Sequence, residues 1–88
     1  MKAILCKSYG PPENLVLEEV QDLKPGEGEA LVEVYAAALN FPDTLQIAEE
    51  YQYQPPLPFS PGSEASGIII ELGPNIKGFE IGDRVMAI

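Results

Sequence analysis

The 88-residue sequence predicts a mainly β domain with one short helix, arranged as a sandwich or a partly open barrel. Two observations favour this fold class. Short apolar segments of strand-like composition recur along the chain, and turns that contain glycine or proline separate them. A single segment, which begins with a proline and an aspartate, has the composition of a helix start.

The first half of the chain contains three candidate strands. Residues 2–9 form the first, and it ends at 10–12 because proline cannot donate to a strand ladder. Residues 14–20 form the second, which a proline- and glycine-containing turn at 24–28 separates from the third. Residues 29–39 form the clearest strand because their side chains alternate. We expect its last residues to be buried on both faces.

The second half predicts one helix and two further strands. The NFPD sequence at 40–43 leads into a helix over 42–50. Four prolines make residues 52–63 an extended segment. Residues 67–73 and 84–88 are strands, and the last one ends while it is still apolar. We therefore expect the chain to continue in a longer protein. Cys6, Phe41 and Phe59 are the expected core residues.

Composition excludes several function classes. Fourteen acidic residues against five basic ones give a net charge of −9, which disfavours binding to nucleic acid. No apolar run approaches the roughly 20 residues of a membrane span. A single cysteine excludes an internal disulfide, so we expect a cytoplasmic protein. Histidine is absent, and a zinc site would have to consist mostly of carboxylates, so no metal site is predicted.

Three segments resemble one protein family in order and spacing. They are ALNFPDT at 38–44, PLPFSPGSEASG at 56–67 and GFEIGDRV at 78–85. In these segments the chain resembles the medium-chain dehydrogenase/reductase superfamily, and within it the zinc-independent NADPH:quinone oxidoreductase branch. The resemblance implies that residues 1–88 are the N-terminal part of a GroES-like catalytic domain. This fold is a distorted β-barrel, which is incomplete in these residues, and the Rossmann domain of the parent protein lies outside them.

The resemblance also implies an activity for the parent protein. The parent would be a homodimer that transfers hydride from NADPH to a quinone or an activated alkene, with NADPH bound mainly by the Rossmann domain. The 88 residues alone are expected to be inactive. Two alternatives stay open: an enoyl-type reductase, and a non-catalytic GroES-like module used for binding or assembly.

Five residues are candidates for the site that the resemblance implies. The amide of Asn40 would face the nicotinamide and the substrate carbonyl as the catalytic group, Asp43 and Thr44 would border the cofactor, and Tyr51 and Tyr53 would line the substrate cleft. Each residue also has a plain structural interpretation. Asn40 is a suitable turn or cap residue, Asp43 and Thr44 suit a helix start, and the tyrosines suit packing on the proline-rich loop.

The chain departs from the family pattern at informative positions. Asn40 and Ser63 stand where the zinc-dependent branch has its cysteine and histidine ligands, so the resemblance implies a zinc-free enzyme. Glu64 is expected to be a structural, buried carboxylate that is bonded to backbone or to an arginine. Glu49 and Glu50 replace a small-basic pair before Tyr51, which makes the implied cleft less basic on that side.

Overall fold

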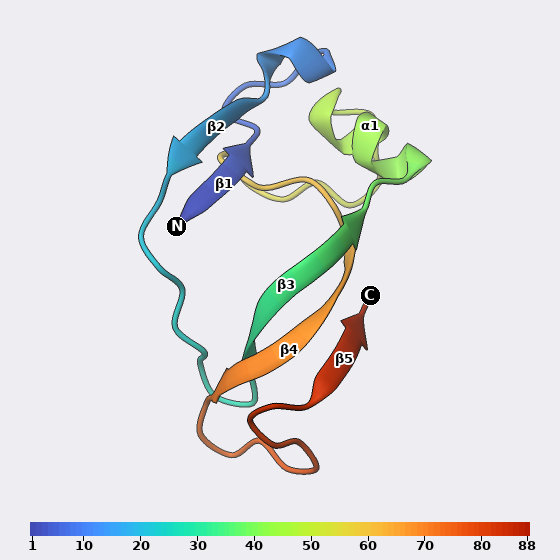
Figure 1. The fold of residues 1–88 in the computed structure, drawn as a ribbon. Helices are drawn as coiled ribbons and strands as arrows, with labels where there is room; N and C mark the ends of the chain where they lie inside the picture. Colours follow the sequence, from blue (N-terminus) through green and yellow to red (C-terminus); the bar gives the residue numbers. More distant parts are fainter. The chain divides into compact units, whose positions relative to one another are not determined.

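The computed structural model describes residues 1–88, which form two compact units (Figure 1). One unit comprises residues 1–21 and 39–63, and the other comprises residues 22–38 and 64–88. Strands predominate, and the single α-helix has seven residues, too few to cross a membrane. The predicted mainly β class with one short helix is confirmed.

The first unit begins with an antiparallel hairpin. Strand β1 (Lys2–Leu5) pairs with β2 (Val16–Glu19), and a 3-10 turn, η1 (Pro12–Asn14), lies between them. The predicted strands 2–9 and 14–20 were both too long. Cys6 lies beyond the hairpin and instead forms a β-bridge with Phe59. The Cys6 N–H donates to the Phe59 carbonyl and the Phe59 N–H donates to the Cys6 carbonyl, with N···O distances of 2.7 and 3.2 Å.

A small core holds the helix of this unit in place. Helix α1 (Phe41–Ile47) contributes Ile47, which packs with Cys6 and Phe59, and Tyr9 and Leu15 cover this cluster. The Gly10 N–H donates to the Ile47 carbonyl at 2.7 Å, which attaches the end of the helix to the segment after β1. Cys6 and Phe59 are therefore core residues, as predicted.

Phe41 is not a core residue, contrary to the prediction, because 74% of its surface is exposed. Asp43 and Ile47 are four residues apart, so they share one helix face, and both are buried. Phe41 precedes Asp43 by two residues, a rotation of about 200° in a helix with 3.6 residues per turn. Its ring therefore lies on the side of α1 away from the core.

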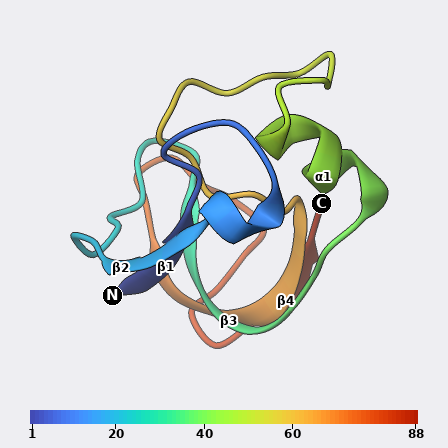
Figure 2. The ribbon, with the colours of Figure 1, turned by 90° about the horizontal axis from the view of Figure 1, so that it is seen from above.

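The second unit is a three-stranded antiparallel sheet in the order β3, β4, β5. The strands are β3 (Ala30–Ala38), β4 (Glu64–Leu72) and β5 (Arg84–Ala87), and Figure 2 shows β3 and β4 curving together. The register shifts between Val34 and Ala36, an irregularity that increases local twist. The sheet does not close into a barrel, which agrees with the prediction of an incomplete GroES-like fold.

Two details of this sheet differ from prediction. Strand β4 begins at Glu64 rather than at residue 67, because Glu64 pairs with Ala38 at the end of β3. The end of β3 was expected to be buried on both faces, but Ala36, Ala37 and Ala38 are all exposed. Within this unit no second layer covers that part of the sheet, so the continuous apolar run at 36–39 did not imply burial.

Candidate functional site

The five predicted site residues all lie in the first unit, at the two ends of α1. Asn40 is the N-cap residue, and Asp43 and Thr44 belong to the first turns of the helix. Tyr51 and Tyr53 lie in the loop that follows its last turn. A seven-residue helix is about 10 Å long, and the Asn40 amide and the aromatic pair lie beyond its two opposite ends.

Asn40 and Asp43 form a capping box at the start of α1. The Asp43 carboxylate accepts the Asn40 backbone N–H at 2.8 Å, and the Asp43 N–H donates to the Asn40 carbonyl at 3.0 Å. A capping asparagine uses its Oδ1 as an acceptor, which leaves the two Nδ2 protons as donors. Asn40 is exposed, and its Nδ2 makes no hydrogen bond within the chain.

The side chains of Asp43 and Thr44 form hydrogen bonds that stabilise the start of α1. Asp43 is only 6% exposed, and its carboxylate accepts the N–H of Asn40. The Thr44 hydroxyl donates to the Phe41 carbonyl at 2.6 Å. These contacts support the plain structural interpretation of both residues. A cofactor contact from either one stays a prediction.

Tyr51 and Tyr53 form an edge-to-face pair. Their ring centroids are 6.0 Å apart and the ring planes are inclined at 68°. This arrangement places the positive edge of one ring toward the negative face of the other, which stabilises aromatic pairs. Tyr51 is half-buried and Tyr53 is 69% exposed. The pair thus presents apolar ring surface to solvent.

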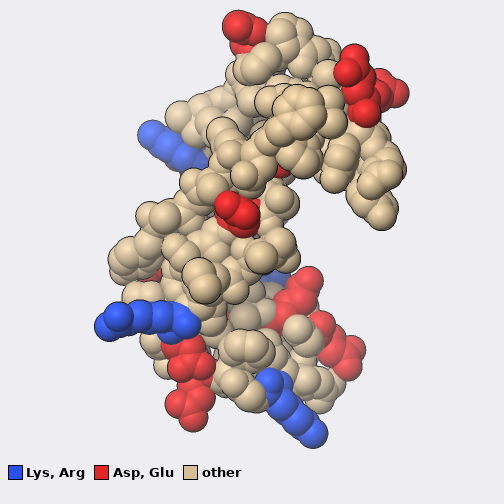
Figure 3. All heavy atoms as spheres, turned by 90° about the vertical axis from the view of Figure 1, so that its right-hand side faces the viewer, with Lys and Arg blue, Asp and Glu red and all other residues tan.

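The charge of this region is negative. Glu49 and Glu50 are exposed just beyond α1, and neither has an ion-pair partner. Residues 39–63 contain no lysine or arginine. Figure 3 shows acidic side chains in several small groups on the face that it draws. Nothing in this segment is therefore suited to binding an anionic group by charge.

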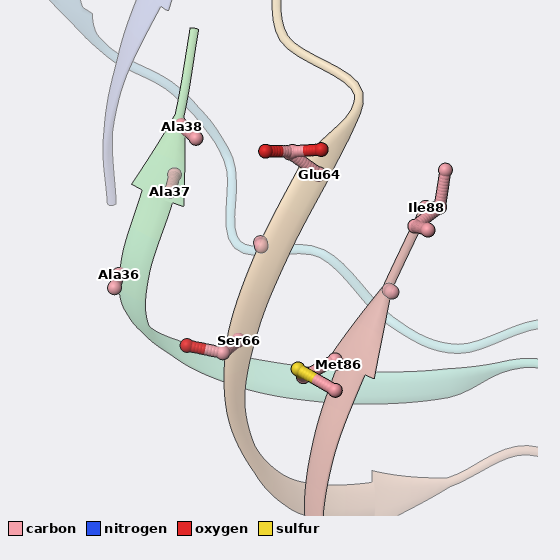
Figure 4. A pocket seen from close by; sticks show the side chains of 9 residues that line it. Ala36, Ala37, Ala38, Glu64, Ser66, Met86 and Ile88 are labelled. Atoms are coloured by element: carbon pink, nitrogen blue, oxygen red, sulfur yellow. The ribbon is translucent and has the colours of Figure 1, made fainter.

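The second unit contains a pocket that none of the predicted site residues line. Its volume is about 340 Å³, and alanines 36–38 of β3, Glu64 and Ser66 of β4, and Met86 and Ile88 at the end of the chain surround it (Figure 4). Glu64 was expected to be a buried, bonded carboxylate, and this was wrong: the residue is exposed, and its carboxylate accepts no hydrogen bond. It lies at the first position of β4, at the edge of the pocket. The run of small alanine side chains at 36–38 was the only feature of the sequence that pointed to this pocket.

Comparison with known proteins identifies the family. Residues 26–88 match the model of the alcohol dehydrogenase GroES-like domain, which is more than half of the chain. The chain belongs to this family. The resemblance of its three segments to the medium-chain dehydrogenase/reductase superfamily is thereby confirmed.

Several members of this family are similar to the chain over nearly all of its length. An acryloyl-coenzyme A reductase of Sulfurisphaera tokodaii is 44% identical over 88 residues, which are 100% of this chain and 25% of that protein. A quinone oxidoreductase-like protein 2 of Rattus norvegicus is 37% identical over 87 residues, 99% of this chain and 24% of that protein. The structure of Escherichia coli quinone oxidoreductase complexed with NADPH superimposes with a TM-score of 0.91 at 36% identity, and covers 98% of this chain and 26% of that one. The GroES-like chain thus spans about a quarter of the length of these relatives.

Proposed function

We propose that these 88 residues are the N-terminal part of the catalytic domain of an oxidoreductase that transfers hydride from NADPH to a quinone or an activated alkene. Three observations support this. The chain belongs to the GroES-like family, relatives that match it over 99–100% of its length are named as reductases, and one solved relative contains NADPH. The proposal extends to a zinc-free, cytoplasmic, homodimeric parent protein.

The exposed Asn40 amide is the observation that carries a catalytic role for this chain. NADPH, when bound, supplies a hydride, and most of its contacts would come from a Rossmann domain outside these residues. The chain itself offers the cofactor few hydrogen-bonding groups, because the side chains of Asp43 and Thr44 already bond to the backbone at the start of α1. The Nδ2 donor of Asn40 is free, and its backbone is fixed by the capping box.

In this proposal Asn40 donates a hydrogen bond to the oxygen that becomes negative during the reaction. When hydride adds to a quinone, the electron pair moves onto a carbonyl oxygen, and a proton from water then neutralises it. A quinone is already electrophilic, so a positioned hydrogen-bond donor suffices and a Lewis-acid metal is not required. Tyr51 and Tyr53, at the other end of α1, would contact the far side of a flat substrate.

An enoyl-type reductase is the second candidate, and one observation favours it. The relative with 44% identity is named as an acryloyl-coenzyme A reductase. The acidic pair Glu49 and Glu50, and the absence of basic residues from 39–63, oppose it in part, because coenzyme A carries several phosphate charges. We therefore place a neutral acceptor first. No observation favours the non-catalytic module.

The test is an NADPH oxidation assay with the full-length protein that contains this chain. Naphthoquinone, a compact enone and acryloyl-coenzyme A are compared as acceptors. The proposal predicts turnover with the quinone or the enone, and no turnover by the 88 residues alone. Turnover of acryloyl-coenzyme A alone would select the second candidate. Absence of turnover with all three acceptors would refute the reductase assignment.

A further inference from the structure

We propose that Gln46 and Gln54 position the two tyrosines, and so set a preference for a flat ring substrate over a compact substrate without a ring. This inference rests on the proposed function, since it concerns the substrate side of the same site. Neither glutamine was singled out by the sequence. In the structure, however, their side chains hold the backbone of both tyrosines.

The two glutamines form a clamp of three hydrogen bonds, which we call the glutamine clamp. Gln54 Oε1 accepts the Tyr51 N–H at 3.2 Å, and Gln54 Nε2 donates to the Gln46 carbonyl at 3.1 Å. Gln46 Nε2 donates to the Tyr53 carbonyl at 3.0 Å. One amide thus connects the first tyrosine to the helix, and the other amide connects the second.

The loop needs this clamp because the chain reverses sharply after α1. Glu49 has a positive φ of 61°, its N–H donates to the Gln46 carbonyl at 3.1 Å, and the Glu50 N–H donates to the Leu45 carbonyl at 2.8 Å. These bonds fix the turn but not the residues after it. Beyond Glu50, only the clamp connects the tyrosine backbone to the helix.

Packing against the protein restrains only one ring of the aromatic pair. Tyr51 is half-buried, but Tyr53 is 69% exposed, so contacts with the core cannot fix the second ring. The edge-to-face geometry therefore depends on where the backbone places the two Cα atoms. Because the two tyrosine rings are already held in place, no conformational entropy is lost in ordering them when a flat ring binds. A compact substrate contacts less of the rings and gains little from this pre-ordering.

The glutamine clamp should affect substrate binding more than turnover. Asn40 lies at the opposite end of α1, about 10 Å away by the length of the helix. Loss of the clamp should leave the capping box unchanged, because no clamp residue hydrogen-bonds to Asn40 or Asp43. We expect KM for a ring substrate to rise, with a small change in kcat.

The experiment compares Gln54→Met with Gln52→Met in the full-length protein. Methionine is close to glutamine in size, and at position 54 it removes two of the three clamp bonds. Gln52 lies between the tyrosines, is exposed and makes no hydrogen bond, so it is the matched control. Gln46→Met, which removes only the bond to Tyr53, is a second variant that keeps the test valid if Gln54→Met folds poorly.

The substrates are naphthoquinone and methyl vinyl ketone, an activated alkene without a ring. We expect Gln54→Met to raise KM for naphthoquinone about threefold to tenfold, with kcat within about twofold and KM for methyl vinyl ketone nearly unchanged. Gln46→Met should show a smaller rise, and Gln52→Met none. An equal rise in KM for both substrates, or equal behaviour of the variants at 52 and 54, would overturn the inference. If the unmodified protein reduces neither substrate, the proposed function itself is wrong and the inference fails with it.

Discussion

The Asp43 carboxylate accepts the backbone N–H of Asn40 at 2.8 Å, so the residue that fixes the start of α1 also fixes the backbone that carries the proposed hydrogen-bond donor. Asp43 is buried on the same helix face as Ile47, which anchors the helix in the core of the first unit. The position of the Asn40 amide is therefore coupled to the stability of the helix. Any test of Asn40 must separate these two roles.

Replacement of Asp43 should lower stability through the capping box. Asp43→Ala removes the acceptor of the Asn40 N–H and should lower the free energy of unfolding by about 1–2 kcal/mol. Asp43→Asn keeps an acceptor oxygen and should recover part of this loss. Urea unfolding of the two full-length variants measures the difference. Equal losses for both variants would show that the carboxylate acts through something other than this hydrogen bond.

Gly67 is expected to be intolerant of a side chain because β3 and β4 approach closely at this position. A Cβ on Gly67 would collide with the Glu33 carbonyl oxygen and would press on the Val32 side chain. Gly67→Ala should therefore cost about 2–3 kcal/mol of stability or more, as overpacking does. Gly78 has a φ of +84° but open space around it, so Gly78→Ala should cost only about 1 kcal/mol. Thermal unfolding that finds Gly78→Ala less stable than Gly67→Ala would contradict this interpretation.

Much of the fold could be predicted from local sequence signals. Proline, asparagine and aspartate at 40–43 gave the start of α1 to within one residue, because capping is a local interaction. Strand limits were less accurate because they depend on pairing partners. Glu64 joins β4 through Ala38, which lies 26 positions earlier in the chain. Burial of Phe41 was predicted wrongly because the composition alone does not say which helix face meets the core.

Only part of the candidate site could be predicted from the sequence. The family resemblance located the asparagine and the tyrosines near α1, and the structure gathers all five predicted residues around that helix. The glutamine clamp was missed because two of its three bonds join side chains to backbone groups seven or eight residues away. Such contacts depend on the path of a loop. No periodicity or spacing rule reveals them.

The isolated 88 residues should associate with one another. The second unit exposes large apolar side chains on its sheet, among them Val34 and Met86, which is 89% exposed. Such a surface favours aggregation in a separated chain. Light scattering of the isolated chain should show oligomers, and the same preparation should oxidise no NADPH. A monomer with a cooperative thermal transition would argue against this prediction.

The parent protein should contain no catalytic zinc. The family resemblance implies that Asn40 and Ser63 stand where the zinc-dependent branch has ligands, and neither is a residue that zinc favours. Elemental analysis of the full-length protein, purified without added metal, should find far less than one zinc per chain. Chelator treatment should leave activity unchanged. One tightly held zinc that is required for turnover would refute the prediction.

The most direct test of the central claim is kcat/KM of Asn40→Asp in the full-length protein, measured with several quinones. Aspartate keeps a capping acceptor, so the thermal midpoint should stay close to that of the unmodified protein, but it lacks the Nδ2 donor. The loss of one strong oxyanion donor costs about 10²–10³-fold. We expect about a tenfold fall in kcat/KM, with kcat reduced in parallel, because the site is exposed and quinones are reactive. Unchanged kcat/KM across the quinones would contradict the account and would leave Asn40 as a helix cap alone.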